Sequence, residues 1–185
     1  MTLFPSILFL HILSAIGLFI GYGLEWTASA LLRRAASGEQ ARAWLRVYRV
    51  SPPLSGASLA VLILSGGYLA SLTDTMKQGW IAASLLGIAI AFFLGIVVNL
   101  PRVHAIRDAV LSVNGTLSAT VLVRLQDPVL ATAVRVRSML AVGIVYLMTA
   151  KPALSTSFVV LGLAMVAGVA LSVPAWSRTE TSKPA

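Results

Sequence analysis

The sequence has no cysteine, few acidic residues and little charge of either sign. Only 11% of its 185 residues are Asp, Glu, Lys or Arg, whereas an ordinary soluble domain devotes about a quarter of its residues to these types. Hydrophobic residues make up 58% of the chain, which leaves too few charged residues to cover a soluble fold. The absence of cysteine excludes disulfides, thiolate metal sites and cysteine nucleophiles. We therefore expect an integral membrane protein.

The charge that is present is mostly positive, with 14 Lys and Arg against 6 Asp and Glu. A nucleic-acid-binding protein gathers its basic residues on a soluble face. Here they lie between apolar runs, so nucleic acid is excluded as a partner. The chain has two histidines far apart, no Gly-rich phosphate loop with a lysine, and no pair of acids within an apolar run. A multi-histidine metal centre is therefore excluded, and a hydrolase is not indicated.

Five apolar runs are separated by charged residues or helix breakers. A transmembrane helix needs about 20 apolar residues, and four of the runs have this length. The fourth run along the chain is shorter, but Asp127-Pro128 is a helix-start signal that extends it, with Arg135 and Arg137 reaching the headgroups. The sequence thus predicts an all-α polytopic transmembrane bundle that forms a single domain over 1–185. The expected spans are residues 3–27, 53–73, 79–101, 131–150 and 153–176.

The basic residues are distributed unevenly between the two sides of this bundle. Twelve of the fourteen fall on one side, and only Lys77 and Lys151 fall on the other. Because Lys and Arg collect in cytoplasmic loops, the N-terminus is expected outside and the C-terminus in the cytoplasm. A signal peptide cleaved near Ala28-Ser29-Ala30 is the alternative for the first run, but positive charge just beyond that triplet disfavours translocation.

A short amphipathic helix is expected between the first two spans. Ser37 and Gln40 have the spacing of a capping box, and the apolar and basic residues that follow lie on opposite faces of a helix. This pattern predicts an interfacial helix over about 38–50 that ends at Pro52-Pro53. A plain connector is the alternative.

The connection after the third span is expected to be a cytoplasmic loop over about 102–130. Its first part should continue the third helix past Pro101, and Asn114-Gly115 is a turn signal. The formal glycosylation sequon at this turn lies on the cytoplasmic side, so we interpret it only as a turn.

The first span carries two ionisable residues, His11 and Glu25, on one stripe of polar and small residues. Ionisable groups in hydrocarbon usually face protein or water, so this stripe should face the bundle interior. Glu25 is expected near the cytoplasmic boundary, where the third span delivers Arg102. We therefore predict a structural ion pair between Glu25 and Arg102.

His11 should lie in the outer leaflet, where a neutral imidazole is able to bind haem iron. Its second axial ligand would be Met148 or Lys151, or the iron would stay five-coordinate. His104 is expected at the opposite membrane boundary, too distant to share one haem with His11. The alternative for His11 is a hydrogen bond to a neighbouring hydroxyl or carbonyl group.

The third span has a small residue or an asparagine at every fourth position. This series consists of Ala83, Gly87, Ala91, Gly95 and Asn99. Small residues at this spacing allow helix backbones to approach closely in a membrane. The series predicts tight packing against another helix, within the bundle or in an oligomer, with Asn99 hydrogen-bonded across the contact.

Several short segments support a family resemblance. They are Leu10-His11-Ile12-Leu13-Ser14-Ala15-Ile16-Gly17, Glu25-Trp26, Leu64-Ser65-Gly66-Gly67-Tyr68 and Gly79-Trp80. With them the chain resembles a broad set of small bacterial inner-membrane proteins of unassigned function. It is also distantly similar to the copper-resistance D-type and J-type protoporphyrinogen oxidase membrane proteins. That similarity implies haem b bound by a first-span histidine, here His11.

Three functions are compatible with these features. The first is a non-enzymatic binding, assembly or accessory subunit of the bacterial inner membrane, in contact with lipids and with other subunits or a second copy of the chain. The second is a haem b-binding redox protein that uses His11. The third is a small transporter, although the sequence has no convincing internal repeat of the kind frequent in transporters.

The uneven charge distribution makes the topology testable. Cysteines introduced next to Lys77 and Lys151 should react with a membrane-impermeant thiol reagent in intact cells, because these residues face the outside. Cysteines next to Arg42 and Arg124 should react only after the membrane is permeabilised. Labelling of the second pair in intact cells would contradict the orientation.

Overall fold

The computed structural model describes residues 3–112 and 117–180, and within these ranges the ordered elements are all helical. Five helical segments are long and apolar enough to cross a membrane, which confirms the predicted all-α five-span fold. The turn expected at Asn114-Gly115 lies outside the described residues. In chain order the elements are α1 (Phe4–Leu32), α2 (Gly38–Leu72), α3 (Gly79–Phe93), η1 (Leu94–Asn99), α4 (Leu100–Leu111), α5 (Ala119–Leu125), α6 (Pro128–Ala150), α7 (Leu154–Ala170) and α8 (Val173–Glu180).

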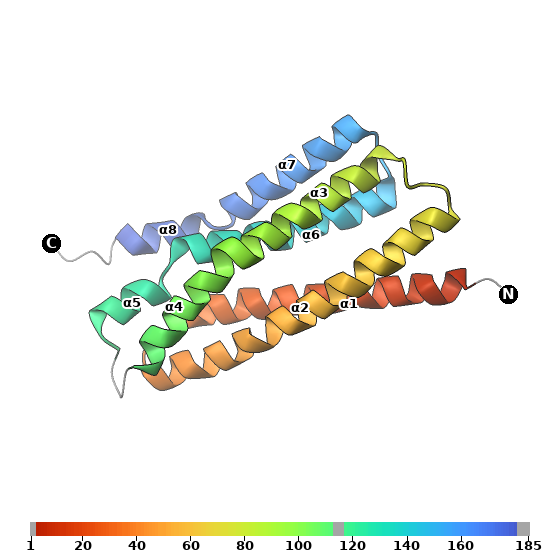
Figure 1. Cartoon of the computed structure of the whole chain (residues 1–185). Helices are drawn as coiled ribbons and strands as arrows, with labels where there is room; N and C mark the ends of the chain where they lie inside the picture. Colours follow the sequence, from red (N-terminus) through yellow and green to blue (C-terminus); the bar gives the residue numbers. More distant parts are fainter. Residues whose placement is uncertain (1–2, 113–116, 181–185) are drawn as a thin grey trace.

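The helices form an elongated bundle in which consecutive spans run antiparallel to each other (Figure 1). Helix α1 packs along α2, and α6 packs along α7. Helix α6 also contacts α1, α3 and η1, and half of the most apolar stretch of its span is buried, against 22–28% for the other four spans. It is therefore the central helix. By contrast, α2 contacts α4 but barely meets α3.

Helix α2 is a single 35-residue helix that includes Pro52 and Pro53. The prediction that these prolines end a separate interfacial helix is therefore wrong. The reason is tertiary packing, since α1 and α2 are in direct contact here. The Ser51 hydroxyl donates to the carbonyl of Gly21 at 2.7 Å, and a Cβ on Gly21 would lie only 2.9 Å from Ser55 Cβ. Neighbouring helices and serine side chains of this kind allow prolines inside membrane helices.

The third span is one continuous helix built from α3, η1 and α4, as expected for a helix that continues past Pro101. Its middle segment, η1, is a π-helical turn. Pro101 has no N–H, and its ring would clash with the carbonyl of Val97 in a regular α-helix. A wider turn just before the proline relieves this clash. Such turns often occur at functional positions, and this one carries the buried Asn99.

Both helix-start predictions are confirmed. The Ser37 hydroxyl caps α2 by accepting the backbone N–H of Gln40. The carboxylate of Asp127 caps α6 by accepting the N–H groups of Val129 and Leu130. These side chains satisfy backbone donors that lack partners at the start of each helix.

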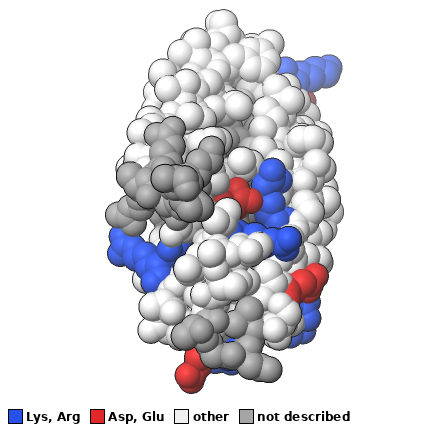
Figure 2. All heavy atoms as spheres, turned by 90° about the vertical axis from the view of Figure 1, so that its left-hand side faces the viewer, with Lys and Arg blue, Asp and Glu red and all other residues white. Residues whose placement is uncertain are grey.

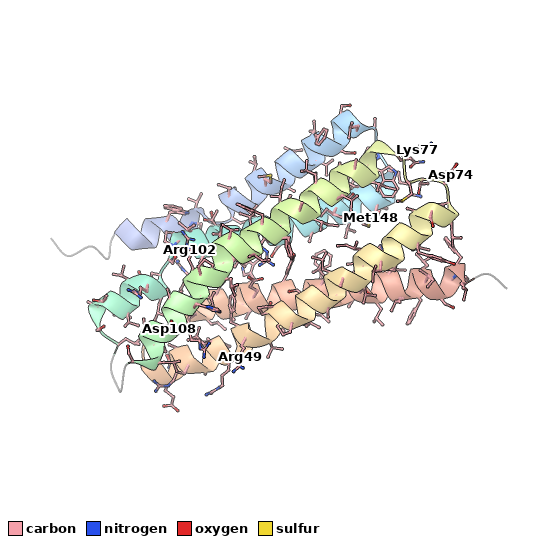
Figure 3. All side chains as sticks on the ribbon, in the orientation of Figure 1. Arg49, Asp74, Lys77, Arg102, Asp108 and Met148 are labelled. Carbon is pink, nitrogen blue, oxygen red and sulfur yellow. The ribbon has the colours of Figure 1, made fainter. Side chains whose placement is uncertain are left out.

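The charged residues separate along the axis of the bundle. Arg49, Arg102 and Asp108 lie toward one end, and Asp74 and Lys77 lie at the other (Figure 3). A view onto the first end shows basic groups distributed around it, with acidic groups among them (Figure 2). By the positive-inside rule, we refer to this end as the cytoplasmic end.

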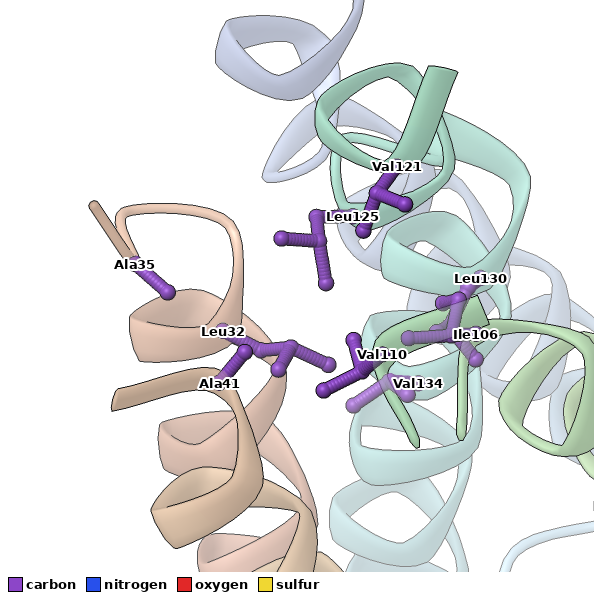
Figure 4. Close-up of a cluster of buried hydrophobic side chains, with 9 residues drawn as sticks. All are labelled: Leu32, Ala35, Ala41, Ile106, Val110, Val121, Leu125, Leu130 and Val134. Carbon is purple, nitrogen blue, oxygen red and sulfur yellow. The ribbon is translucent and has the colours of Figure 1, made fainter. Parts of the chain in front are cut away.

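A hydrophobic cluster closes the cytoplasmic end around α1, α4, α5 and α6 (Figure 4). Leu32 and Ile106 are almost fully buried in it, and Val110 is completely buried. The segment expected as a loop over about 102–130 is thus largely structured, because α4 and α5 bury apolar side chains against the ends of two spans. The cluster consists of Leu32, Ala35, Ala41, Ile106, Val110, Val121, Leu125, Leu130 and Val134.

The closest backbone approach at a glycine occurs between α6 and α7. A Cβ placed on Gly168 would lie 2.5 Å from the Cα of Val136, whereas a Cβ on Gly162 of the same helix would meet nothing within 4 Å. The backbone of α6 therefore leaves no room for a side chain at Gly168. At Gly162 there is open space beside the helix.

This difference gives a matched pair of substitutions. Gly168→Ala should lower the thermal stability of the detergent-solubilised protein, because α7 has to move away from α6. Gly162→Ala should leave stability unchanged or raise it slightly, since alanine is favoured over glycine within a helix by up to about 1 kcal/mol. Equal melting temperatures for the two variants would mean that the α6–α7 contact is not as close as described.

Candidate binding cleft and its buried ion pair

Glu25 lies at the centre of a buried polar cluster that joins four elements. Its side chain comes from α1, and the residue is only 4% exposed. Arg137 Nη1 from α6 donates to Oε1 at 2.7 Å and to Oε2 at 2.9 Å. The Tyr48 hydroxyl from α2 donates to Oε1 at 2.6 Å, and Asn99 Nδ2 from η1 donates to the same oxygen at 2.8 Å. The carboxylate thus ties α1, α2, α6 and η1 together.

The guanidinium group of Arg137 is held on two sides. It lies 4.8 Å from the centre of the Tyr22 ring, a distance typical of a cation–π contact. On the other side it packs against Gly95, where an added Cβ would lie 3.1 Å from Arg137 Cζ. The absence of a side chain at Gly95 therefore gives this arginine room between η1 and α1.

The structure corrects the predicted partner of Glu25. Arg102 instead pairs with Asp127 at the start of α6, with 3.2 Å between Nε and Oδ2. The prediction that Arg137 reaches the headgroups is also wrong, because its side chain is only 12% exposed and points into the bundle. The physical reason is the central position of α6, which brings its arginine to Glu25 between α1 and η1. The position of Glu25 within the first span predicts its depth in the membrane. It does not predict which helices surround the carboxylate.

Arg135, the other arginine expected to reach the headgroups, lies over an aromatic ring. Its Cζ is 5.6 Å from the centre of the Trp26 ring. Its Nη1 atom is buried without a hydrogen-bond partner among the described residues. The two arginines of α6 therefore both contact α1, one through a carboxylate and one through an aromatic face.

The small-residue series of the third span faces mainly α6. A Cβ added to Gly87 would lie 3.2 Å from side-chain carbons of both Ile144 and Leu161, and Ala83 and Ala91 are buried. Further along the helix the series reaches the polar cluster, where Gly95 contacts Arg137 and Asn99 donates to Glu25. Close approach and the ion pair thus occur on one helix face.

His11 is hydrogen-bonded across the α1–α2 contact. Its Nδ1 lies 3.0 Å from Ser65 Oγ, and its ring packs on Gly66. The Ser65 hydroxyl also lies 2.6 Å from the carbonyl of Val61; when it donates its proton there, it accepts the Nδ1 proton of His11. This assignment leaves Nε2 as the unprotonated nitrogen, the form that binds metals.

The other two residues predicted for a haem site, Met148 and Lys151, have contacts of their own. Met148 lines a small apolar cavity of about 50 Å³ whose lining does not include His11. Lys151 lies 6.0 Å from the centre of the Trp80 ring. Among the described residues, no group of three or more metal-binding side chains occurs. Haem binding at His11 stays a prediction.

A large cleft lies between α2 on one side and α3, η1 and α4 on the other. Its volume is about 1050 Å³, and its floor is formed by Tyr22, Glu25 and Arg137. The cleft exists because α2 contacts the third span mainly near the cytoplasmic end, through α4. Sequence reasoning missed it, since no pattern in the sequence specifies which helices stay apart.

The two halves of the cleft differ in chemistry. The half toward the membrane interior is lined by apolar side chains, among them Leu59, Ala60, Ile63, Leu85, Ile88, Ala89 and Phe92. The half toward the cytoplasmic end is lined by basic side chains, namely Arg42, Arg46, Arg49, His104 and Arg107. The polar cluster of Glu25 lies between the two halves. At this boundary Asn99 Oδ1 is buried and has no hydrogen-bond partner among the described residues.

The corrected ion pair predicts a specific pattern of stability. Glu25→Gln and Arg137→Gln should each lower the free energy of unfolding by roughly 3–5 kcal/mol, because each leaves a buried partner uncompensated. The double variant should lose less than the sum of the two.

Arg102→Gln is the matched control for this cycle. Arg102 is partly exposed, so its loss should cost under about 1 kcal/mol and should add to the effect of Glu25→Gln. Thermal or denaturant unfolding in detergent measures these values. Additivity with Arg137→Gln, or coupling with Arg102→Gln, would contradict the observed pairing.

Comparison with known proteins identifies the family but no function. No curated protein and no solved structure matches the chain. A family model described as "Predicted integral membrane protein (DUF2269)" matches residues 5–152, which include the Glu25 cluster and the whole cleft lining. This match covers well over half of the chain, and the chain therefore belongs to this family of integral membrane proteins.

Proposed function

We propose that the protein is a non-enzymatic binding or accessory subunit of the bacterial inner membrane, with its N-terminus outside. In this proposal the cleft between α2 and the third span holds an amphiphilic molecule taken from the surrounding lipid. The observation that carries the proposal is the cleft itself, about 1050 Å³ in volume, with apolar walls joined to a basic end. Ligand sites of this size usually have mainly apolar walls and a few placed polar groups.

The contacts of Glu25 support a structural role for this residue. Its carboxylate accepts two hydrogen bonds from Arg137 and one each from Tyr48 and Asn99. Both carboxylate oxygens are therefore engaged by groups of the protein itself. We therefore assign Glu25 a structural role at the floor of the cleft.

A cleft-filling experiment tests the proposal. Ala60 on α2 and Ala89 on α3 both line the apolar half, and either Ala60→Trp or Ala89→Trp should obstruct it with a bulky side chain. With dioleoyl phosphatidylglycerol as the probe, native mass spectrometry should show one retained lipid on the unmodified protein and loss of this lipid in both variants.

Ala167→Trp provides the control, because Ala167 is exposed on α7 and does not line the cleft. It adds the same bulk but should retain the lipid. Melting temperatures confirm that all three variants are folded. Retention of the probe by both cleft variants, or its absence from the unmodified protein, would contradict the proposed binding function.

Haem binding is the second candidate, and the hydrogen bond between His11 and Ser65 favours it, because the tautomer with its proton on Nδ1 leaves Nε2 unprotonated. The absorption spectrum distinguishes the two candidates. Under the binding proposal, protein expressed with ample haem should be colourless after purification. A Soret band that disappears in His11→Ala would support the haem protein instead.

A further inference from the structure

We propose that the basic half of the cleft selects an amphiphile with an anionic phosphate head, so that the preferred occupant is an anionic phospholipid of the cytoplasmic leaflet. This inference rests on the proposed binding function and specifies its ligand. It concerns the charge of the head, whereas the proposed function concerns only occupation of the cleft. The two statements can therefore fail separately.

The charge of the cleft lining points to an anion. Arg42, Arg46 and Arg49 line the cleft from α2, and Arg107 lines it from α4. The acidic residue in this lining is Glu25, whose charge is already neutralised by Arg137. Arg46, Arg49 and Arg107 therefore give the basic half an excess of positive charge.

The spacing of the arginines places them on one surface. Positions 42, 46 and 49 are separated by four and three residues, so they lie along one face of α2. Arg107 belongs to the opposite wall, and His104 lies one turn before it. A phosphate between the two walls would have guanidinium groups on both sides. Guanidinium groups suit this role because they donate paired hydrogen bonds to phosphate oxygens.

The length of the cleft fits a lipid with its head at this end. From Arg46 to Ala60 is about 21 Å along α2 at 1.5 Å per residue, and one leaflet of hydrocarbon is about 15 Å deep. A head at the arginines would therefore place its acyl chain along the apolar half. Basic pockets between membrane helices on the cytoplasmic side bind phospholipid heads in this way.

A zwitterionic head fits this site less well than an anionic one. Its quaternary ammonium group would lie close to several arginines, and the described lining of the cleft offers no acid other than the paired Glu25. Phosphatidylglycerol carries the phosphate without this cation. We therefore expect preference for phosphatidylglycerol over phosphatidylcholine with the same acyl chains.

Competition between these two lipids tests the inference. Native mass spectrometry of the full-length protein with equal amounts of dioleoyl phosphatidylglycerol and dioleoyl phosphatidylcholine should show at least about a tenfold preference for the anionic lipid, equivalent to about 1.4 kcal/mol. In Arg46→Gln/Arg107→Gln the preference should fall severalfold, because one guanidinium group is lost from each wall. Binding of phosphatidylcholine should be little changed, since the apolar half is intact.

Arg34→Gln/Arg124→Gln is the matched control, because it removes two positive charges from the same end without touching the cleft lining. It should keep the preference. An equal loss in both double variants would mean that lipids respond to the overall charge of this end, and would overturn the site.

Equal retention of both lipids by the unmodified protein would also overturn the inference. If Ala60→Trp then still displaced both lipids, the proposed binding function would stand without the charge selection. If Ala60→Trp and Ala89→Trp displaced neither lipid, the binding function itself would fail.

Discussion

The burial of one carboxylate is the constraint on which this structure depends. Glu25 lies inside a membrane helix, where an unpaired charge is costly, and its partners come from α2, η1 and α6. Each of these elements must approach α1 at the same depth to satisfy it. The π-helical turn before Pro101 presents Asn99, and the bare backbone of Gly95 admits Arg137. The ion pair thus fixes the centre of the bundle near its cytoplasmic boundary.

The same arrangement accounts for the cleft. Helices α1 and α6 meet behind the ion pair, and α2 and α3 attach to this centre from two sides without packing on each other. Tyr48 holds α2 to Glu25, and Asn99 holds η1 to the same carboxylate. Toward the membrane interior, α2 and α3 face each other across the cleft with apolar side chains. A bundle that buries its charge in this way leaves a cleft between α2 and the third span. Basic residues then line the end of this cleft at the cytoplasmic end of the bundle.

Patterns in the sequence predict most of the fold, because hydrophobic length and charge asymmetry act locally. The spans, the helix starts at Ser37 and Asp127 and the side on which arginines gather all follow from short segments. The continuous helix through Pro52-Pro53 does not, since it depends on contact with α1 at Gly21. Within the site, Glu25 is identified by its position in an apolar run. Spacing along the chain points to Arg102 rather than Arg137 as its partner, because helix order around α1 is a tertiary property that spacing does not encode.

The central claim is that the space between α2 and the third span holds a lipid chain in the membrane. Photo-crosslinking in bilayers tests this claim most directly, with a phosphatidylglycerol that carries a photoreactive diazirine in its acyl chain. Peptide mapping should find adducts concentrated on residues of both facing walls, near Ile63 of α2 and Phe92 of α3. Adducts spread evenly over the lipid-facing surfaces, with α7 labelled as strongly as the two walls, would contradict the account.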